Sequence, residues 1–147
     1  WKNYGVLTVS LRYFTVYGPR QRPDMAIHKF VTAILNGDEI TIFGDGTQTR
    51  DFTYVADVVE ANILAANNAV VGEVFNIGGG SRISVNALID EIEKIVGNKA
   101  KVKYIEKQKG DVRDTLADVS KANEKLNWET KINIYRGLKK FIEEFEC

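Results

Sequence analysis

The sequence is short of the residues that build disulfides and transition-metal centres. Cys147 is the single cysteine and His28 the single histidine among 147 residues. One thiol cannot form an internal disulfide, which fits a reducing, cytoplasmic location. Without a cluster of histidine and cysteine, a transition-metal site is not expected. The composition therefore predicts neither a metal centre nor a disulfide framework.

An excess of one charge and long apolar runs are also missing. Twenty Lys and Arg residues balance 20 Asp and Glu residues, so the formal net charge is zero. Such a chain has no bulk basic field for nucleic acid or anionic lipid. No apolar run approaches the ~20 residues that are needed to cross a bilayer. Nucleic acids and membranes are therefore not expected as partners, and an anion site must be built locally from a few arginines.

The glycine loops that bind phosphates in many nucleotide enzymes are absent as well. The run Asn76-Ile77-Gly78-Gly79-Gly80 is the nearest candidate. It contains no Gly-x-Gly-x-x-Gly, and no Lys-Ser or Lys-Thr pair follows it. We therefore expect a turn that ends a strand.

What the sequence does contain is an alternation of β-type and helical apolar patterns, which predicts an α/β fold. Asn36-Gly37 and Gly97 are typical ends of helices, and Ser84 and Ser120 are typical N-caps. The pattern predicts strands at 6–14, 39–43, 51–54, 73–77 and 101–105, and helices at 25–35, 55–66, 84–97, 120–126 and 134–145.

The first predicted strand, residues 6–14, mixes β-branched, aromatic and leucine residues with little alternation. This is typical of a parallel strand that is buried on both faces. No strand–helix unit precedes it, and alone it would leave an exposed, adhesive edge. We therefore expect it to lie within a larger doubly wound sheet, with residues 1–4 as the end of a preceding helix.

Two motifs carry the most information, Leu-Arg-Tyr-Phe-Thr-Val-Tyr-Gly-Pro-Arg at 11–20 and Ile-Phe-Gly-Asp-Gly-Thr-Gln-Thr-Arg-Asp-Phe at 42–52. Together they resemble the C-terminal part of an extended short-chain dehydrogenase/reductase that acts on nucleotide sugars, nearest to the UDP-glucose 4-epimerase group. The resemblance covers Tyr4 to about Ile142. The glycine-rich cofactor loop and catalytic Tyr-x-x-x-Lys of that group do not precede the motifs here. The resemblance thus implies that residues 1–20 are the last strands of a Rossmann-like sheet, that residues 21–147 form a small mixed α/β substrate-binding domain, and that an N-terminal cofactor domain is missing.

Arg50 is the leading binding residue. The resemblance implies that it contacts the diphosphate of the sugar nucleotide, and a guanidinium offers a rigid, permanently charged fork of donors for that task. The alternative is a surface arginine paired with Asp51 or Asp45, because exposed ion pairs are common and weak.

Two further segments of the resemblance concern the base and the cofactor. Ile42, Phe43 and Gly44 correspond to the surface that packs on uracil, although Phe43 can equally be a core residue at a strand end. Tyr13 and Phe14 correspond to residues that line the nicotinamide side of NAD.

Thr15 stands where many sugar epimerases have an asparagine that donates to the diphosphate. A threonine hydroxyl retains one donor but not the reach of the amide. This departure is similar to 4-epimerases of UDP-glucuronate, as is the segment Arg22-Pro23-Asp24-Met25-Ala26, from which we take Met25 and Ala26 as substrate-binding residues. The alternative for Thr15 is a β-branched residue that simply suits a strand.

A late segment, Gly110-Asp111-Val112-Arg113, resembles the stretch that closes over phosphates and ribose in this family. Asp111 is expected to accept a ribose hydroxyl and Arg113 to add charge at the diphosphate; the alternative is that the two pair with each other. Some epimerases have an arginine where Gln108 stands here. Trp128, in Leu-Asn-Trp-Glu, is expected to be a core residue.

The resemblance implies a full-length enzyme that uses NAD to epimerise a UDP-hexose, such as UDP-glucose, at C4. It also implies that this enzyme is a homodimer. Its catalytic residues would lie before Trp1, so the chain alone is expected to be inactive. A 4,6-dehydratase or a decarboxylase of the same superfamily is an alternative. A non-catalytic nucleotide-binding or interaction protein is another, which the joint presence of Arg50, Asp111 and Arg113 disfavours.

Overall fold

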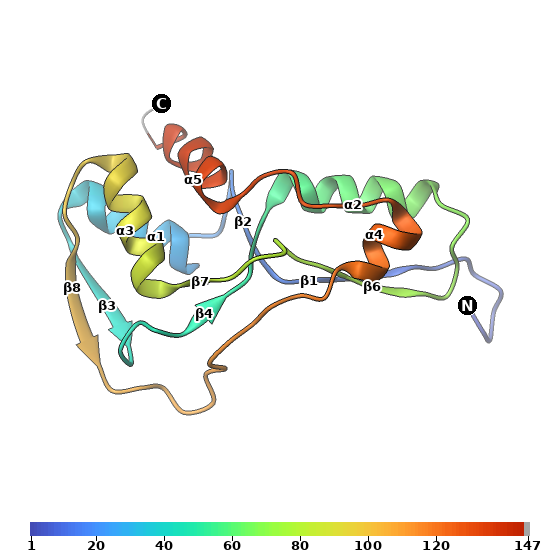
Figure 1. Cartoon of the computed structure of the whole chain (residues 1–147), viewed down its shortest axis with the longest axis horizontal. Helices are drawn as coiled ribbons and strands as arrows, with labels where there is room; N and C mark the ends of the chain where they lie inside the picture. The colour runs from blue at the N-terminus through green and yellow to red at the C-terminus, as the bar shows by residue number, and fades with distance from the viewer. Residues whose placement is uncertain (146–147) are drawn as a thin grey trace.

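The computed structural model describes residues 1–145, which form strands and helices in alternation (Figure 1). This confirms the α/β fold that the sequence predicts. The elements, in chain order, are β1 Ser10–Tyr13, β2 Thr15–Tyr17, α1 Ala26–Asn36, β3 Glu39–Phe43, β4 Thr49–Arg50, β5 Phe52–Tyr54, α2 Val55–Asn67, β6 Val74–Ile77, β7 Ile83–Ser84, α3 Val85–Val96, β8 Lys101–Ile105, α4 Ser120–Leu126 and α5 Ile134–Glu143.

Within residues 1–145, three parallel pairs of strands organise the fold. β1 pairs with β6, β2 with β5 and β3 with β8, whereas β4 and β7 form a short antiparallel pair. The first two pairs combine strands from both sides of residue 20, where the sequence analysis places a domain boundary. The division into 1–20 and 21–147 stays a prediction.

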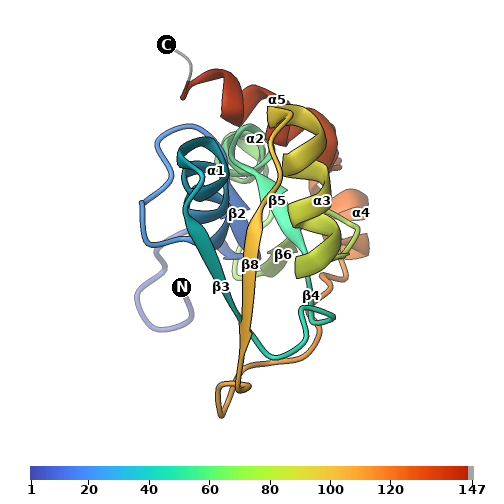
Figure 2. The same ribbon diagram turned by 90° about the vertical axis from the view of Figure 1, so that its left-hand side faces the viewer.

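Two hydrophobic clusters lie toward opposite ends of an elongated molecule (Figure 1). The larger cluster is built by α1, β3, α3 and α5. Figure 2 shows β3 and β8 side by side at that end, with α1 and α3 packed on one face of them. Side chains alternate across a strand, so Ile40 and Ile42 are buried there while Thr41 and Phe43 are exposed. The smaller cluster joins α2, β6 and α4 around Trp128.

The predicted helix ends are mostly confirmed, because the local chemistry decides them. Gly37 and Gly97 adopt left-handed conformations with φ of 72° and 83° after α1 and α3. The Ser84 hydroxyl accepts a hydrogen bond from the Ala87 N–H and caps α3. The prediction for Ser120 is wrong: it is the first residue of α4, and its N–H donates to Asp118 Oδ1. The residue at the N-cap position is Val119, whose side chain makes no capping hydrogen bond.

The prediction for the first strand is only partly right. Residues 6–9 lie outside any strand, and the extended chain instead continues past residue 14 as β2. β1 is largely exposed rather than buried on both faces, and Tyr4 and Leu7 have exposed fractions of 88% and 78%. Residues 2–4 form a turn, closed by a hydrogen bond from Gly5 N to Trp1 O, rather than the end of a helix. β1 has only β6 beside it, and of its four residues only Leu11, which packs against the smaller cluster, is partly buried.

Trp128 lies in the core with an exposed fraction of 1%, as predicted. Its indole Nε1 donates to the carbonyl of Asp57 at 2.9 Å. The buried carboxylate of Asp57, in the first turn of α2, accepts from the hydroxyl of Thr130 and from the N–H groups of Lys131 and Ile132. This network fixes the segment between α4 and α5 against the start of α2.

Helix α4 is also joined to β6 by charge. Glu73, just before β6, accepts from Lys121 Nζ at 2.6 Å and from Lys125 Nζ at 2.8 Å. These two hydrogen bonds, with a smaller contribution from the positive charges, lower the pKa of Glu73 from 4.5 to about 2. A carboxylate with a depressed pKa stabilises the fold above its ordinary pKa and loses that contribution as the pH falls.

Glu73→Gln is therefore expected to destabilise the protein above pH 4.5 and to lose this effect between pH 4.5 and about pH 2. Urea unfolding of both proteins at a series of pH values measures the difference. Glu124→Gln, on the exposed side of the same helix, is the control and should show a much smaller pH-dependent difference. A Glu73→Gln effect that grows as the pH falls would contradict the pairing.

No helix within residues 1–145 is long and apolar enough to cross a membrane. The same described residues contain no group of three His, Cys, Asp or Glu side chains that could hold a metal ion.

Candidate functional site

Arg50 lies at the end of β4, and its side chain is about one-fifth exposed, at 19%. Its Nη1 donates to the carbonyls of Thr49 at 2.9 Å and Arg113 at 3.1 Å, and its Nη2 donates to Asp111 Oδ1 at 2.5 Å. The structure therefore pairs Arg50 with neither Asp51 nor Asp45, the two partners that the sequence analysis considered. Its partner comes from the segment that follows β8.

Asp51 turns the other way and is fully buried. Its carboxylate accepts from the N–H groups of Gly79 and Ala117, at 2.5 and 2.9 Å. Burial raises the pKa of Asp51, while the hydrogen bonds from Ala117, Gly79 and Gly80 oppose the shift. A Cβ on Gly79 would lie 2.2 Å from the carbonyl oxygen of Phe52, so this position requires glycine. The glycine run after β6 is thus a strand-ending turn, as predicted, which also binds a buried carboxylate.

A cavity of about 310 Å³ opens beside Arg50. It lies between the start of α1, the end of β3 and the segment after β8. Five of the nine predicted substrate-binding residues line it: Ala26, Ile42, Phe43, Arg50 and Asp111. Met25 caps α1 with no side-chain hydrogen bond to the helix, and the N-terminal end of a helix attracts negative charge.

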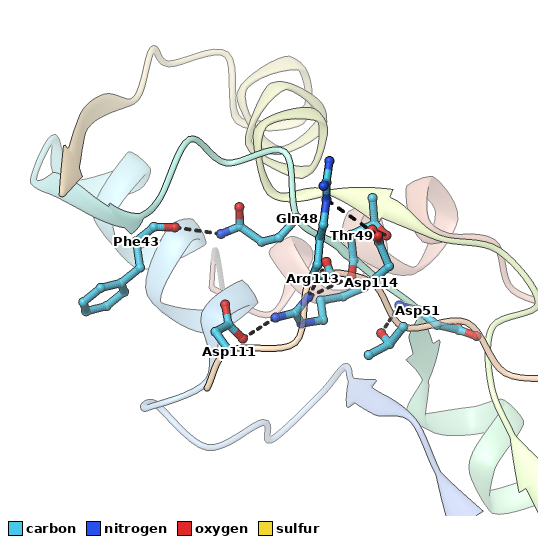
Figure 3. A network of polar contacts seen from close by, with 9 residues as sticks. Phe43, Gln48, Thr49, Asp51, Asp111, Arg113 and Asp114 are labelled. Carbon is cyan, nitrogen blue, oxygen red and sulfur yellow. Dashed lines mark hydrogen bonds and ion pairs between the residues drawn. The ribbon is translucent and has the colours of Figure 1, made fainter. Parts of the chain in front are cut away.

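The end of β3 supplies the aromatic surface of this cavity. Phe43 has an exposed fraction of 44%, whereas its neighbour Ile42, on the opposite face of β3, is buried at 3%. Gly44 follows in a left-handed conformation with φ of 78°, and its N–H donates to the carbonyl of Ile105. Gln48 reaches back to donate to the carbonyl of Phe43 at 2.9 Å (Figure 3). The backbone bend therefore holds an accessible aromatic ring at the edge of the cavity.

The segment after β8 contributes Asp111 and Arg113 (Figure 3). The two do not pair with each other. Asp111 pairs with Arg50, and the Arg113 guanidinium, with a side-chain exposure of 78%, lies 3.9 Å from Asp114. Arg113 lines a second hollow of about 320 Å³, which shares Phe43, Gln48 and Asp111 with the cavity. Gly44 lines this second hollow too.

The remaining predicted residues lie elsewhere. The hydroxyl of Tyr13 donates to Asn62 Oδ1 on α2 at 2.8 Å, and the N–H of Phe14 donates to the carbonyl of Ile77. Thr15 is paired in register with Phe52, whose ring lines the cavity, but Thr15 itself does not line it. Met25 lines a separate hollow of about 280 Å³ beside Arg22. The roles assigned to these four residues stay predictions.

Lys29 also lines the cavity, and the sequence did not lead us to expect this residue there. Lys29 makes no ion pair within residues 1–145. Its spacing is a signal that was available: Ala26, Lys29 and Phe30 are three and four residues apart and share a face of α1. The cavity thus has two cationic side chains, Lys29 and Arg50, of which one is paired with a carboxylate.

The cavity is separate from the residues that are expected to contact NAD. Tyr13 and Phe14 do not line the cavity, and no Gly-x-Gly-x-x-Gly loop precedes them. One Tyr-x-x-x-Lys spacing does occur, at Tyr135 and Lys139, but both residues are exposed on α5 and neither lines the cavity. The cavity therefore combines the cations Lys29 and Arg50 with the aromatic edge of Phe43, and the carboxylates of Asp24 and Asp111 line it as well.

Parallel strand pairs covered by helices, with an arginine-bearing cavity at the carboxyl end of β3, define an α/β protein of the Rossmann-like class. A family model described as the NAD dependent epimerase/dehydratase family matches residues 1–78, and the chain belongs to this family.

Curated and solved relatives agree with this assignment. The chain is 47% identical over 140 residues to a UDP-glucuronate 4-epimerase of Thermodesulfobacterium geofontis, covering 95% of this chain and 43% of that protein. A UDP-glucose 4-epimerase of Thermotoga maritima, solved with UDP-glucose, superposes with a TM-score of 0.93 at 43% identity, covering 99% of this chain and 48% of that one.

A UDP-glucuronic acid 4-epimerase of Bacillus cereus, solved with UDP-glucuronic acid and NAD, superposes equally well. Its TM-score is 0.93 at 41% identity, over 99% of this chain and 47% of that one. The chain therefore spans a little under half the length of the relatives that it matches. The NAD dependence of the family agrees with the cofactor expected from the sequence.

Proposed function

We propose that this chain forms the nucleotide-sugar-binding part of an NAD-dependent 4-epimerase of UDP-hexoses. The observation that supports this most directly is the cavity that contains Arg50, Lys29 and the exposed ring of Phe43. Two cations match a diphosphate, and an accessible aromatic ring offers a face on which a base can stack.

In this proposal the chain binds and orients, while the chemistry takes place elsewhere. NAD, when bound by the full-length protein, supplies the hydride exchange at the C4 carbon of the sugar. Arg50 holds the diphosphate and the end of β3 holds the base. Fixing these remote parts of the substrate places the sugar for reaction, which is how binding energy contributes to rate. The catalytic tyrosine and lysine of the family would come from residues outside this chain.

Thr15 is the feature that favours one hexose over another. Threonine at this position, with the Arg22 to Ala26 segment, resembles 4-epimerases of UDP-glucuronate, and the T. geofontis and B. cereus relatives are named for that substrate. UDP-glucuronate is therefore the first substrate to test, and UDP-glucose is the second. A cytoplasmic homodimer remains part of the proposal for the full-length protein.

The experiment is product analysis. The full-length protein, with NAD, is incubated separately with UDP-glucuronate, UDP-glucose, UDP-N-acetylglucosamine and dTDP-glucose. We expect the C4 epimer of one UDP-hexose and no loss of mass. Release of CO2 or water would instead support the decarboxylase or dehydratase alternative. Binding without turnover would support the non-catalytic one, and epimerisation by residues 1–147 alone would contradict the assignment of catalysis to other residues.

A further inference from the structure

The segment 106–114, which follows β8, is attached to the rest of the protein mainly at its two ends. It has no helix and only a single-residue strand bridge at Asp114, and every one of its side chains is exposed. Its far end is held firmly: Thr49 N donates to the carbonyl of Arg113, and Thr49 Oγ1 donates to Asp114 Oδ1 at 2.6 Å. Its near end continues β8, which pairs with β3.

Between these two ends, one charged contact joins the segment to the cavity. Asp111 Oδ1 accepts from Arg50 Nη2 at 2.5 Å, and Asp111 keeps 35% of its side chain exposed. Gly110, just before it, has a φ of 87° and no atom within 4 Å of where a Cβ would be. The space on that side of Gly110 is open.

Arg50 is divided between permanent and exchangeable partners. A guanidinium has five N–H donors. Two donate to backbone carbonyls, which hold the side chain in place whether or not a ligand is bound. A third donates to Asp111, and the other two have no partner within residues 1–145. While Asp111 is in contact, an approaching anion meets a neutral pair instead of a free cation.

We propose that Asp111 occupies the place of a ligand phosphate on Arg50 in the ligand-free protein, and that a nucleoside diphosphate displaces it. Like charges repel strongly at such short range, so a phosphate and the Asp111 carboxylate do not share one N–H edge of Arg50. Displacement frees the part of the segment around Asp111 from Arg50, while Thr49 and the hydrogen bond from Arg50 to the carbonyl of Arg113 keep its far end attached. This inference rests on the proposed function and adds an internal competitor for Arg50. Asp111 lowers the affinity for any ligand that offers no hydrogen-bond donor to the displaced carboxylate.

Inorganic pyrophosphate is the probe that isolates this effect, because it has no ribose hydroxyl that could donate a hydrogen bond to the freed carboxylate of Asp111. Calorimetric titration of the full-length protein is compared for wild type, Asp111→Asn and Asp114→Asn. Asp114→Asn is the matched control, since it removes the same single negative charge three residues away, and Asp114 contacts Thr49 and Arg113 rather than Arg50. We expect Asp111→Asn to bind pyrophosphate about two- to fivefold more tightly than Asp114→Asn, the range that corresponds to a partly exposed ion pair.

A second measurement follows the segment directly. Trypsin cleaves after Lys107 and Lys109, both exposed, and mass spectrometry identifies those cuts. Cleavage there should be faster in Asp111→Asn than in Asp114→Asn without ligand, and pyrophosphate should speed it in the wild type. Affinity for pyrophosphate that is equal in the two variants, or weaker in Asp111→Asn, would overturn the displacement. Wild-type protein that binds neither UDP nor pyrophosphate would overturn the proposed function as well, so the two failures are distinct.

Discussion

Trp128→Ala is expected to lower the free energy of unfolding by about 3–5 kcal/mol, the range for truncating a large buried aromatic residue. Trp128 fills the smaller cluster between α2, β6 and α4, with an exposed fraction of 1%. Its loss would leave a cavity against Ala61, Ala122 and Leu126, and would remove the hydrogen bond to the carbonyl of Asp57. Urea unfolding followed by circular dichroism measures the change without relying on tryptophan fluorescence.

Trp1 provides a control of the same residue type. Its side chain has an exposed fraction of 54% at the start of the chain, so Trp1→Ala should change the stability by no more than about 0.5 kcal/mol. If the two variants lose similar stability, Trp128 is not the centre of that cluster, and the packing of α4 against β6 must be supported by other residues.

Arg50→Ala is expected to weaken binding of UDP and of the UDP-sugar by about 1.5–3 kcal/mol, the scale of hydrogen bonds to a charged group. This corresponds to roughly a 10- to 150-fold higher Kd. The structure supports a large effect because the Arg50 guanidinium is held by two carbonyls before any ligand arrives, so little side-chain freedom is lost on binding. Isothermal titration calorimetry of the full-length protein measures it.

Two variants sharpen the interpretation of that result. Arg50→Lys keeps the charge but not the planar fork, and should retain only part of the affinity. Arg136→Ala removes an exposed arginine from α5, outside the cavity, and should leave the affinity unchanged. Equal losses in Arg50→Ala and Arg136→Ala would indicate that net charge, and not a contact at the cavity, controls binding.

Much of this fold follows from local patterns. The alternation of β3 and the spacing of α1 and α3 lie within short stretches, and their ends at Gly37, Ser84 and Gly97 are decided by neighbouring atoms. The first strand was harder to predict, because the burial of a strand depends on elements that are distant in the sequence. Residues 6–14 have the composition of an interior strand, yet three of the four residues of β1 are exposed and only Leu11 is partly buried.

The candidate site shows the same division. The cavity position of Arg50 and Phe43 agrees with their motif, in which both lie on one bend of the chain. The partner of Arg50 was not predictable in this way, since Asp111 is 61 residues further along and nearer carboxylates were available. Asp51 was the obvious candidate by sequence, but successive side chains of an extended segment point to opposite sides. Its carboxylate therefore binds the glycine turn after β6 instead of Arg50.

The central claim is that Arg50 binds the diphosphate of a sugar nucleotide. A crystal structure of the full-length protein with UDP tests this claim most directly. We predict guanidinium nitrogen atoms of Arg50 at about 2.7–2.9 Å from phosphate oxygen atoms, the usual length of such charged hydrogen bonds. Phosphates bound elsewhere, with Arg50 out of hydrogen-bonding distance from every one of their oxygen atoms, would contradict the account.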